Sequence, residues 1–533
     1  MSSTPQTIDE LVQRSVASRG AELALADAPN RASFFAGEPI RLTWGELDAA
    51  IDSVAGSFGQ LGVGVGDAVA IQLPNIVELV VSILACSRAG AVAVPFPIQH
   101  RSHELRHGFS TANVKAALTA ARPDRPDQLE VMSEVAQEFG GTPIAVFGDV
   151  TIDGALQLSL ATSSANQGGA SAAHRSAADD VATVCWTSGT TGTPKGVPRT
   201  HSMWMASSQF QVDELEITAE DRILCPFPVV NMAGIGGMLL PWITVGAALY
   251  LHQPLDLPVF LGQLSSEQIT YTVAPPPLLN MLLANDALLA DVDLSNIRAI
   301  SSGSAPLDPW MVEGWQNRGV QIVNVFGSNE GAAMLSTEKA VPDPTERARY
   351  FPRPDRPGVE VRLVDIETGE EILERGVLGE LRFRGTTVFD GYLDSTGEEF
   401  DDQGFYRTGD LFELAGESDP PNLFRFVDRA KDIIIRGGMN ISAAEVEGLL
   451  GSHPSVVECA AVGFPDAELG ERLGVFVVAA PDTAPTLDEL ADHLRAAGVA
   501  SYKLPERIEL IEALPRNPVG KVTKPDLRQA WSS

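Results

Sequence analysis

The apolar run Val181 to Trp186 leads directly into a loop of glycines, hydroxyl residues and one lysine, TSGTTGTPKG, from Thr187 to Gly196. Glycines let consecutive backbone N–H groups turn inward, hydroxyl groups add donors, and Lys195 supplies a cation for phosphate. The loop is not a Walker A sequence, because Pro194 and Gly196 stand where that motif needs a glycine and a hydroxyl residue. The pattern predicts a buried strand that ends in a phosphate-binding turn. A flexible surface turn is the alternative.

Six further motifs follow the loop in a fixed order, and together they decide between these interpretations. They are SGSAPL at Ser302 to Leu307, NVFGSNEG at Asn324 to Gly331, GELRFRGTTVFDGY at Gly379 to Tyr392, YRTGD at Tyr406 to Asp410, DRAKDIIIRGGMNISAAEVE at Asp428 to Glu447, and PRNPVGK at Pro515 to Lys521. This series resembles the adenylate-forming (ANL) superfamily, which includes acyl-CoA synthetases (AMP-dependent acid:CoA ligases) and aryl-acid AMP ligases. The resemblance extends over nearly the whole chain from about Leu42 onward.

Short apolar runs alternate with longer helical patterns, which predicts α/β layers with largely parallel sheets. One such run, Val69 to Leu73, precedes an apolar helix through Ala89 that Gly90 is well placed to end. At 533 residues the chain exceeds the usual size of a single core, so we expect more than one domain. The resemblance implies a large N-terminal domain, residues 1–429, of stacked mixed sheets with helices and a β-barrel-like subdomain. It also implies a small, mobile α+β C-terminal lid, residues 430–533.

Charge and cysteine usage narrow the partners and the compartment. The formal net charge of −32 disfavours nucleic acid and anionic membranes as partners. The four cysteines are far apart in apolar surroundings, which is typical of buried free thiols in a reducing compartment. Neither a signal peptide nor a run of 18 or more apolar residues is apparent, so we expect a cytoplasmic protein without an integral membrane segment.

The segment HRSHELRH places His100, His103 and His107 at helical spacing. Imidazoles on one helix face could bind a metal. The segment also matches the position of an ordinary surface helix in the family. We therefore expect a solvated helix face.

Joining a carboxylate to the α-phosphate of ATP brings two anions together, so the site must neutralise charge and hold an in-line geometry. The resemblance assigns catalysis to Lys521, Glu330 and Thr190, with Glu330 as the Mg2+ ligand and Lys521 carried on the lid. It assigns ATP binding to three stretches and the ribose pair: Thr187, Ser188, Gly189, Thr190, Thr191, Gly192 and Lys195; Gly303, Ser304 and Ala305; Asn324, Phe326, Gly327, Ser328 and Asn329; and Asp410 with Arg429. Lys431 is the implied hinge, and Gly437 and Gly438 belong to the thiol channel through which CoA reacts.

The acid is expected to contact Trp204, Asn231, Gly234, Gly237 and Ala274. Residues 226–242 and 271–284 contain no lysine, arginine, aspartate or glutamate. An amino acid would leave its ammonium group unpaired there, which is costly. We therefore expect a monocarboxylic acid with an apolar body.

Three departures from the family pattern bear on the site. Asn329 replaces a threonine that meets the α-phosphate, although an amide can still donate a hydrogen bond. Asn231 replaces a histidine at the acid entrance. Asp428 stands where many relatives have glycine, beside Arg429.

Three functions remain open. The first is an acid:CoA ligase, with the acid, ATP and CoA as small-molecule partners and a homodimer as a candidate assembly. The second is an aryl-acid AMP ligase that loads a separate carrier protein, since PRTH at Pro198 to His201 also resembles that branch. The third is a non-catalytic nucleotide or acyl-adenylate binding protein, which the altered Asn329 allows.

Overall fold

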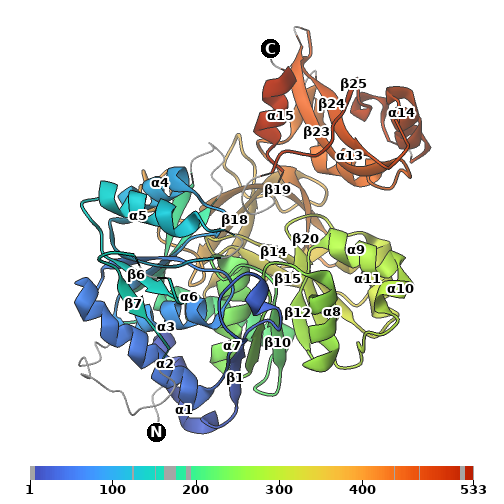
Figure 1. Ribbon diagram of the computed structural model, residues 1–533. Coiled ribbons are helices and arrows are strands. Elements are labelled where there is room, and N and C mark those ends of the chain that lie inside the picture. Colours follow the sequence, from blue (N-terminus) through green and yellow to red (C-terminus); the bar gives the residue numbers. More distant parts are fainter. Residues whose placement is uncertain are drawn as a thin grey trace. The chain divides into compact units, whose positions relative to one another are not determined.

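The computed structural model describes residues 6–122, 125–150, 152–160, 176–187, 194–436, 439–466, 468–497, 499–516 and 522–531. The chain forms two compact units (Figure 1). Residues 1–348, 356–359 and 384–400 make the first unit, and residues 349–355, 360–383 and 401–533 make the second. The predicted boundary between residues 429 and 430 falls inside the second unit and stays a prediction.

The first unit contains a largely parallel seven-stranded sheet in the order β7-β6-β5-β3-β4-β8-β9, as far as the described residues extend. Only the edge pair β8–β9 is antiparallel. Its strands are β3 (Ala68–Gln72), β4 (Val92–Pro95), β5 (Val114–Ala120), β6 (Ile144–Phe147), β7 (Leu156–Leu158), β8 (Val181–Thr187) and β9 (Lys195–Thr200).

A second sheet of this unit has the described strand order β15-β14-β13-β12-β10-β11-β1-β2, parallel except for the edge pairs β1–β2 and β14–β15. The predicted parallel α/β layers are thus confirmed. Its strands are β1 (Leu23–Ala26), β2 (Arg41–Thr43), β10 (Arg222–Cys225), β11 (Ala248–Leu251), β12 (Tyr271–Val273), β13 (Ala299–Gly303), β14 (Gln321–Gly327) and β15 (Ala333–Ser336).

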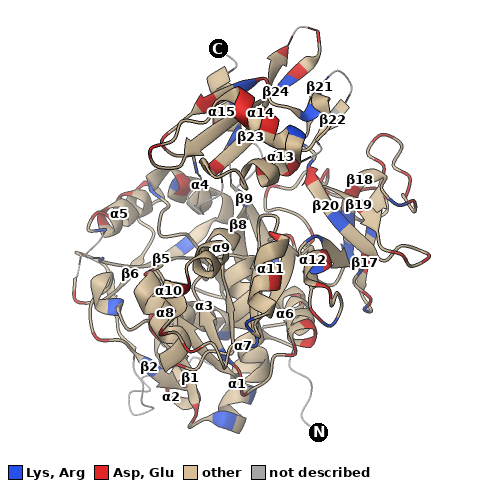
Figure 2. Cartoon of the chain, turned by 90° about the vertical axis from the view of Figure 1, so that its right-hand side faces the viewer, with Lys and Arg blue, Asp and Glu red and all other residues tan. Residues whose placement is uncertain are grey.

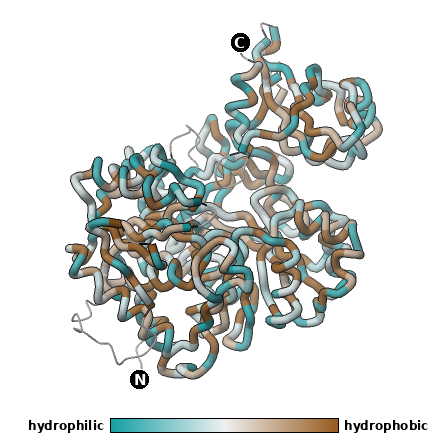
Figure 3. The backbone as a smooth tube through the Cα atoms, in the orientation of Figure 1, coloured by the Kyte–Doolittle hydropathy of each residue, from teal (hydrophilic) through white to brown (hydrophobic). Residues whose placement is uncertain are grey.

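Helices join and cover these strands. Figure 3 shows that the hydrophobic stretches of the chain lie mostly in the interior of the unit. The helices are α1 (Ile8–Arg19), α2 (Trp44–Ser57), α3 (Val77–Ala89), α4 (Ser102–Ala112), α5 (Gln128–Glu138), α6 (His201–Leu215), α7 (Leu240–Val245), α8 (Leu257–Ser266), α9 (Pro276–Ala284), α10 (Asp286–Leu289), α11 (Pro309–Gln316) and α12 (Pro344–Arg347), with the short 3₁₀ turns η1 (Arg31–Ser33) and η2 (Phe58–Leu61) and the π-helical turn η4 (Met232–Leu239).

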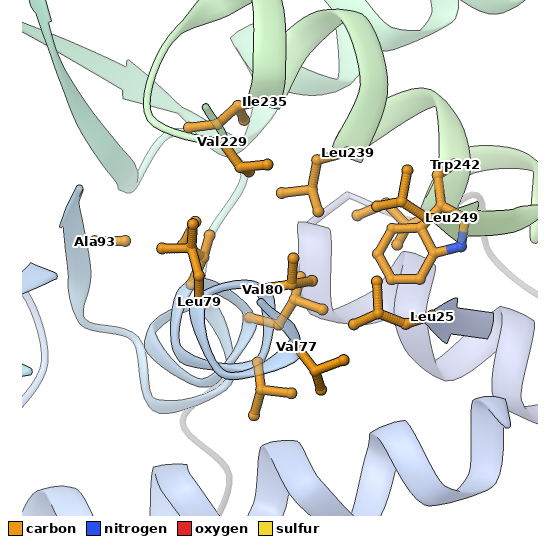
Figure 4. Packing of buried hydrophobic residues seen from close by; sticks show 14 of the residues in the cluster. Leu25, Val77, Leu79, Val80, Ala93, Val229, Ile235, Leu239, Trp242 and Leu249 are labelled. Carbon is orange, nitrogen blue, oxygen red and sulfur yellow. The ribbon is translucent and has the colours of Figure 1, made fainter. Parts of the chain in front are cut away.

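Helix α3 packs against strands of both sheets, and twelve of its thirteen residues are buried. Figure 4 shows Val80 near Leu25 of the eight-stranded sheet, and Leu79 facing Ala93 of the seven-stranded sheet. A mostly apolar helix is enclosed in this way, and its two charged residues, Glu78 and Arg88, form ion pairs. Gly90 ends the helix with φ of 71°, as predicted, because this left-handed conformation favours glycine.

The second unit contains two five-stranded sheets, counted over its described residues. The first, β16-β20-β19-β18-β17, corresponds to the expected β-barrel-like subdomain. The second, β22-β21-β24-β23 with β25 beside β24, forms the small α+β C-terminal part with three helices. The elements are β16 (Tyr350–Pro352), β17 (Val359–Val364), β18 (Leu378–Gly385), β19 (Tyr406–Ala415), β20 (Leu423–Arg429), β21 (Ile434–Arg436), β22 (Met439–Ile441), β23 (Val456–Asp466), β24 (Gly470–Ala479), β25 (Arg507–Leu510), α13 (Ala443–Leu450), α14 (Leu487–Ala496), α15 (Lys524–Trp531) and the 3₁₀ turn η5 (Ser501–Lys503).

Helices α14 and α15 carry acidic residues, which are red in Figure 2. In the part of the chain that is described, no helix combines the length and the apolar character needed to cross a bilayer. All four cysteines are free thiols; three are buried and Cys459 is partly exposed.

The expected solvated histidine face is wrong for His100. This residue precedes α4 and is buried, and burial lowers its pKa to about 4. His103 on α4 is exposed, and His107 is half-buried.

Candidate active site

Helix α4 contacts the chain on both sides of the predicted phosphate loop. Residues 188–193 lie outside the described residues, but Thr187 at the end of β8 pairs with Lys195 at the start of β9. The Nε2 atom of His107 lies 2.7 Å from the Pro194 carbonyl oxygen, and its ring meets the Trp186 ring edge-on at 5.9 Å between centroids. The loop therefore connects two paired strands, and both of its ends are fixed.

Lys195, Tyr392 and Glu330 form a chain of contacts within the first unit. The Lys195 Nζ atom lies 4.4 Å from the centroid of the Tyr392 ring, a cation–π distance. The Tyr392 hydroxyl donates to Glu330 Oε1 at 2.8 Å. Glu330 is buried, and its backbone carbonyl accepts a hydrogen bond from the Phe389 N–H at 2.9 Å. A carboxylate has about four acceptor positions, so this arrangement leaves Glu330 capacity for a hard cation.

Asn329 bridges two segments through its amide. Its Oδ1 atom accepts from the Met232 N–H at 2.8 Å, and its Nδ2 donates to the Trp186 carbonyl at 3.1 Å. The residue thereby joins the end of β8 to the start of η4. An amide carries two N–H hydrogens, so one remains available to another acceptor.

Arg199, at the end of β9, is completely buried, and among the described residues it forms no ion pair with a carboxylate within 4 Å. Its guanidinium carbon lies 4.6 Å from the Trp204 ring centroid. Burial lowers its pKa to about 10, so it is a cation at neutral pH. Its Nη1 donates to Asn329 O (3.3 Å), and the two hydrogens of Nη2 are shared among three acceptors: Thr387 O (2.8 Å), Ser207 Oγ (2.9 Å) and Met203 O (3.3 Å).

A cavity of about 120 Å3 lies within the first unit, and no charged side chain lines it. Helix α6 contributes Ser207 and Phe210, η4 contributes Gly236 and Gly237, and the end of β13 with the following turn contributes residues 301–304. Gly331, Val359 and Thr387 complete part of the wall. Gly331 has φ of +96°, and a Cβ atom there would lie 1.8 Å from the Thr387 carbonyl oxygen, so only glycine fits.

Asn231 caps η4. Its Oδ1 accepts from the backbone N–H groups of Ala233 and Gly234 at 3.1 and 3.2 Å. Asparagine is among the favoured residues at a helix start for this reason. Asn231, which stands where the family has histidine, therefore fixes the start of η4, and η4 forms one wall of the cavity.

The predicted acid contacts overlap the cavity only in part. Gly237 lines it, whereas Trp204, Asn231, Gly234 and Ala274 do not. Trp204 is buried and donates from Nε1 to Thr183 Oγ1 at 2.9 Å. The predicted acid contacts stay a prediction.

Several predicted nucleotide residues surround the same cavity. Gly303, Ser304 and Gly327 line it, and Ser304 adopts φ of +67°, which is uncommon for a residue with a side chain. Ala305 beside them is exposed. Strained backbone of this kind clusters at binding sites.

Strand β14 and the turn after it contain both side chains that hold neighbouring elements in place and side chains that remain accessible. The Asn324 side-chain amide donates to the carbonyls of Arg347 and Ala348, so it holds α12. Phe326 on β14 is half-buried, and Ser328 donates its backbone N–H to the Ala332 carbonyl. Phe326 thus retains an accessible surface on which a base could stack.

In the second unit, the predicted ribose residues lie together. Asp410 on β19 is opposite Arg429 on β20, and Arg429 Nε is 3.2 Å from Asp410 Oδ1. Asp428, next to Arg429, is buried and holds α13: its Oδ2 accepts from Ser442 Oγ at 3.1 Å and from the Ala444 N–H at 3.0 Å. Lys431, the predicted hinge, is exposed.

Eight predicted site residues lie outside the described residues, and their roles stay predictions. They are Ser188, Gly189, Thr190, Thr191 and Gly192 of the loop, Gly437 and Gly438 of the thiol channel, and Lys521.

The structure adds three residues to which the sequence assigned no role: Tyr392, Arg199 and Ser207. Tyr392 ends the motif GELRFRGTTVFDGY, and Arg199 lies in PRTH, so both positions belong to motifs that the sequence shows. Their contacts could not be predicted from the sequence, because Arg199 reaches backbone carbonyls as distant as residues 329 and 387.

Comparisons with known proteins extend over most of the chain. The family model of the AMP-binding enzymes matches residues 21–393, and that of the AMP-binding enzyme C-terminal domain matches residues 445–521. Medium-chain fatty-acid–CoA ligase of Escherichia coli (strain K12) is 32% identical over 500 residues, which cover 91% of this chain and 85% of that protein. Pyochelin synthase PchD of Pseudomonas aeruginosa (strain UCBPP-PA14) is 31% identical over 500 residues, with 92% and 88% coverage.

Solved structures with the same fold include ATP-bound MatB from Rhodopseudomonas palustris. The TM-score is 0.81 at 26% identity, over 98% of this chain and 99% of that one. The ordered motifs, the two largely parallel sheets and the matches along the sequence agree, and the chain belongs to the AMP-binding enzymes, the adenylate-forming superfamily.

Proposed function

We propose that the chain activates an apolar monocarboxylic acid with ATP and then transfers the acyl group to CoA. In the first half-reaction a carboxylate oxygen of the acid attacks the α-phosphorus of ATP, and pyrophosphate leaves. In the second half-reaction the CoA thiol attacks the acyl carbon, AMP leaves and the thiol proton is released. The observation that carries the proposal is the cavity without charged lining residues, whose wall includes Gly331, directly after Glu330.

The residues of the first unit suit a site where two anions must meet. Lys195 supplies a cation, and the buried Glu330 has free acceptor capacity. Mg2+ bound to Glu330 would neutralise charge on the phosphate oxygens. The remaining hydrogen of the Asn329 amide is available to a phosphate, so asparagine at this position is compatible with adenylation.

The uncharged lining favours an apolar acid over an amino acid. An ammonium group buried there would find no carboxylate among the lining residues, and an unpaired buried charge is costly. Asp410 and Arg429 are proposed to bind the ribose hydroxyls, since a carboxylate accepts and a guanidinium donates.

CoA is the favoured acceptor because the E. coli relative is named a fatty-acid–CoA ligase. A carrier protein is the second candidate, and it is supported by the similarity to a pyochelin synthase. The two acceptors share the first half-reaction and differ only in the second.

Purified protein incubated with ATP, Mg2+ and a panel of acids, with and without CoA, tests the proposal. Pyrophosphate release that depends on the acid, with thioester formed when CoA is added, supports it. Release without thioester formation favours the carrier-protein alternative. No release with any acid would contradict adenylation and favour a non-catalytic binding protein.

Lys521→Ala should lower the rate of acyl-AMP formation by about two orders of magnitude or more, because a preorganised cation near developing charge is worth roughly that much. Nucleotide affinity should change much less. The checks are single-turnover pyrophosphate release and nucleotide titration. Adenylation within a few-fold of wild type would show that Lys521 is not catalytic.

A further inference from the structure

Ser207 is the one described lining residue of the cavity whose side chain is held by the buried Arg199. Arg199 donates from Nη2 to Ser207 Oγ at 2.9 Å. The hydroxyl oxygen accepts this bond, so its own hydrogen must find a different acceptor. None of the described residues provides one, and Ser207 lines the cavity. The hydroxyl is therefore an available donor at the cavity wall.

The donor is also fixed in place. Arg199 is completely buried, stacks on Trp204 and donates to three backbone carbonyls besides Ser207. A guanidinium held at this many points cannot swing away. A hydroxyl that accepts from a cation is a stronger donor, because hydrogen-bond chains polarise one another.

A second hydroxyl of the cavity is independent of this arrangement. Ser302 lines the cavity and is 1% exposed, and its Oγ atom has no hydrogen-bond partner. In contrast, the hydroxyls of Tyr271 and Ser301 lie 2.8 Å apart and bond to each other. A buried hydroxyl without a partner is costly, so a ligand that supplies one gains affinity.

We infer that the acid carries a neutral oxygen atom, as a hydroxyl, ketone or ether, on its otherwise apolar body, and that Ser207 donates a hydrogen bond to it. The inference rests on the proposed function and narrows its substrate class. A plain hydrocarbon body beside Ser207 and Ser302 would offer neither hydroxyl an acceptor.

A second carboxylate on the acid is disfavoured. The lining offers no cationic side chain: Arg199 does not line the cavity, and although its Nε has no hydrogen-bond partner, its Nη2 already donates to protein oxygens. A desolvated carboxylate needs several donors or a paired cation. A neutral oxygen needs only one donor, which Ser207 supplies.

The test compares acids that differ by one oxygen atom. Octanoate is measured against its keto and hydroxy derivatives along the chain, and 3-phenylpropanoate against its ring hydroxyl and methoxy derivatives. Suberate supplies the dicarboxylate. The readout is kcat/KM for pyrophosphate release, with wild type, Ser207→Ala and Ser208→Ala.

Ser208 is a matched control because it follows Ser207 on α6, is buried, and pairs instead with Thr244 Oγ1 at 2.7 Å. We expect at least one oxygenated acid to exceed its parent acid by about fivefold to tenfold, the effect of one neutral hydrogen bond. Ser207→Ala should lower kcat/KM for the oxygenated acid more than for its parent acid, by about the same fivefold to tenfold, and so remove this advantage. Ser208→Ala should preserve it.

The inference is overturned if no oxygenated acid is preferred, if the preference survives Ser207→Ala, if Ser207→Ala lowers both members of a pair equally, or if suberate is the best substrate. In the first three cases acids are still adenylated and the proposed function stands, whereas suberate as the best substrate would also contradict an apolar monocarboxylic acid, though not adenylation itself. Absence of pyrophosphate release with every acid contradicts the proposed function, and the inference falls with it.

Discussion

Tyr392 contacts Lys195 with its ring and Glu330 with its hydroxyl, so one side chain orients both charges of the candidate site. Tyr392→Phe keeps the ring and removes the hydrogen bond to Glu330. Because an oriented ligand binds a metal more tightly, we expect the Mg2+ concentration for half-maximal adenylation to rise about tenfold, with the KM for the acid little changed.

Tyr392→Ala removes the cation–π contact as well and should reduce adenylation further than Tyr392→Phe. The measurement is pyrophosphate release across a Mg2+ titration for both variants. An unchanged Mg2+ dependence in Tyr392→Phe would mean that the hydroxyl does not position Glu330.

At this scale, sequence patterns identify residues that belong to motifs and miss those defined by contacts. Lys195 and Glu330 could be predicted because motif spacing carries their chemistry. The role of Arg199 could not, since its partners are mainly backbone carbonyls, which any residue supplies. Ser207 gave no signal for the same reason: a helical serine is ordinary until its neighbour is known.

At the scale of elements, the strand and helix pattern was largely predictable, because buried parallel strands are short apolar runs and glycine ends helices in a recognisable way. The π-helical turn η4 was not predicted. Three glycines, Gly234, Gly236 and Gly237, weaken its helical signal. Its start depends on Asn231, whose capping role is visible only in the structure.

Asn231→Ala should change the ranking of acids and leave the KM for ATP nearly intact. The substitution removes the cap of η4, a loss of about 1 kcal/mol, and loosens the wall that carries Gly236 and Gly237. Asn231→Asp keeps a capping oxygen and is the control. If the Ala variant ranks acids as wild type does, η4 does not shape the acid site.

Asp428 links β20 to α13 across the predicted hinge at Lys431. Its carboxylate accepts hydrogen bonds from the Ser442 hydroxyl and the Ala444 N–H, and Arg429 N–H adds a third at 2.7 Å. Asp428→Ala should free this connection, because buried bonds to a charged acceptor contribute about 1.5–3 kcal/mol each. We expect faster tryptic cleavage after Arg429 or Lys431, by about tenfold or more.

The exposed Asp402, replaced by alanine, is the control for the loss of an acidic residue. Mass spectrometry of the fragments identifies the cleaved bond. Equal cleavage rates in wild type and Asp428→Ala would mean that these contacts do not restrain the hinge segment.

For the whole molecule, length and alternation predicted several layers and more than one domain, the family resemblance implied a small C-terminal part, and the largely parallel sheets are confirmed. The return of residues 356–359 and 384–400 to the first unit could not be predicted. Local patterns record what a segment forms and not which neighbours it joins. The burial of His100 and His201 escaped prediction for the same reason, because both are polar residues near helix starts.

We expect His201 to make the stability of the first unit depend on pH. It is 2% exposed, its Nδ1 accepts from the Ile8 N–H at 3.3 Å, and burial lowers its pKa to about 4, although Asp180 and Glu10 act in the opposite direction. The unfolded value is about 6.5, so between pH 4 and 6.5 the unfolded chain binds more protons at this residue. Its contribution to the free energy of unfolding is therefore constant above about pH 6.5 and falls as the pH drops towards 4.

His201→Asn keeps an acceptor for the Ile8 N–H and removes the titrating group. Its free energy of unfolding should fall less steeply than that of wild type below pH 6.5, by up to about 1.4 kcal/mol per pH unit, the value for one proton. Urea denaturation at steps from pH 4.5 to 7.5 measures both curves. Asp27, whose pKa burial raises to about 6, is present in both proteins, so its opposite effect cancels in the difference. The exposed His103→Asn is the control. Parallel curves for wild type and His201→Asn would exclude His201 as a source of acid sensitivity.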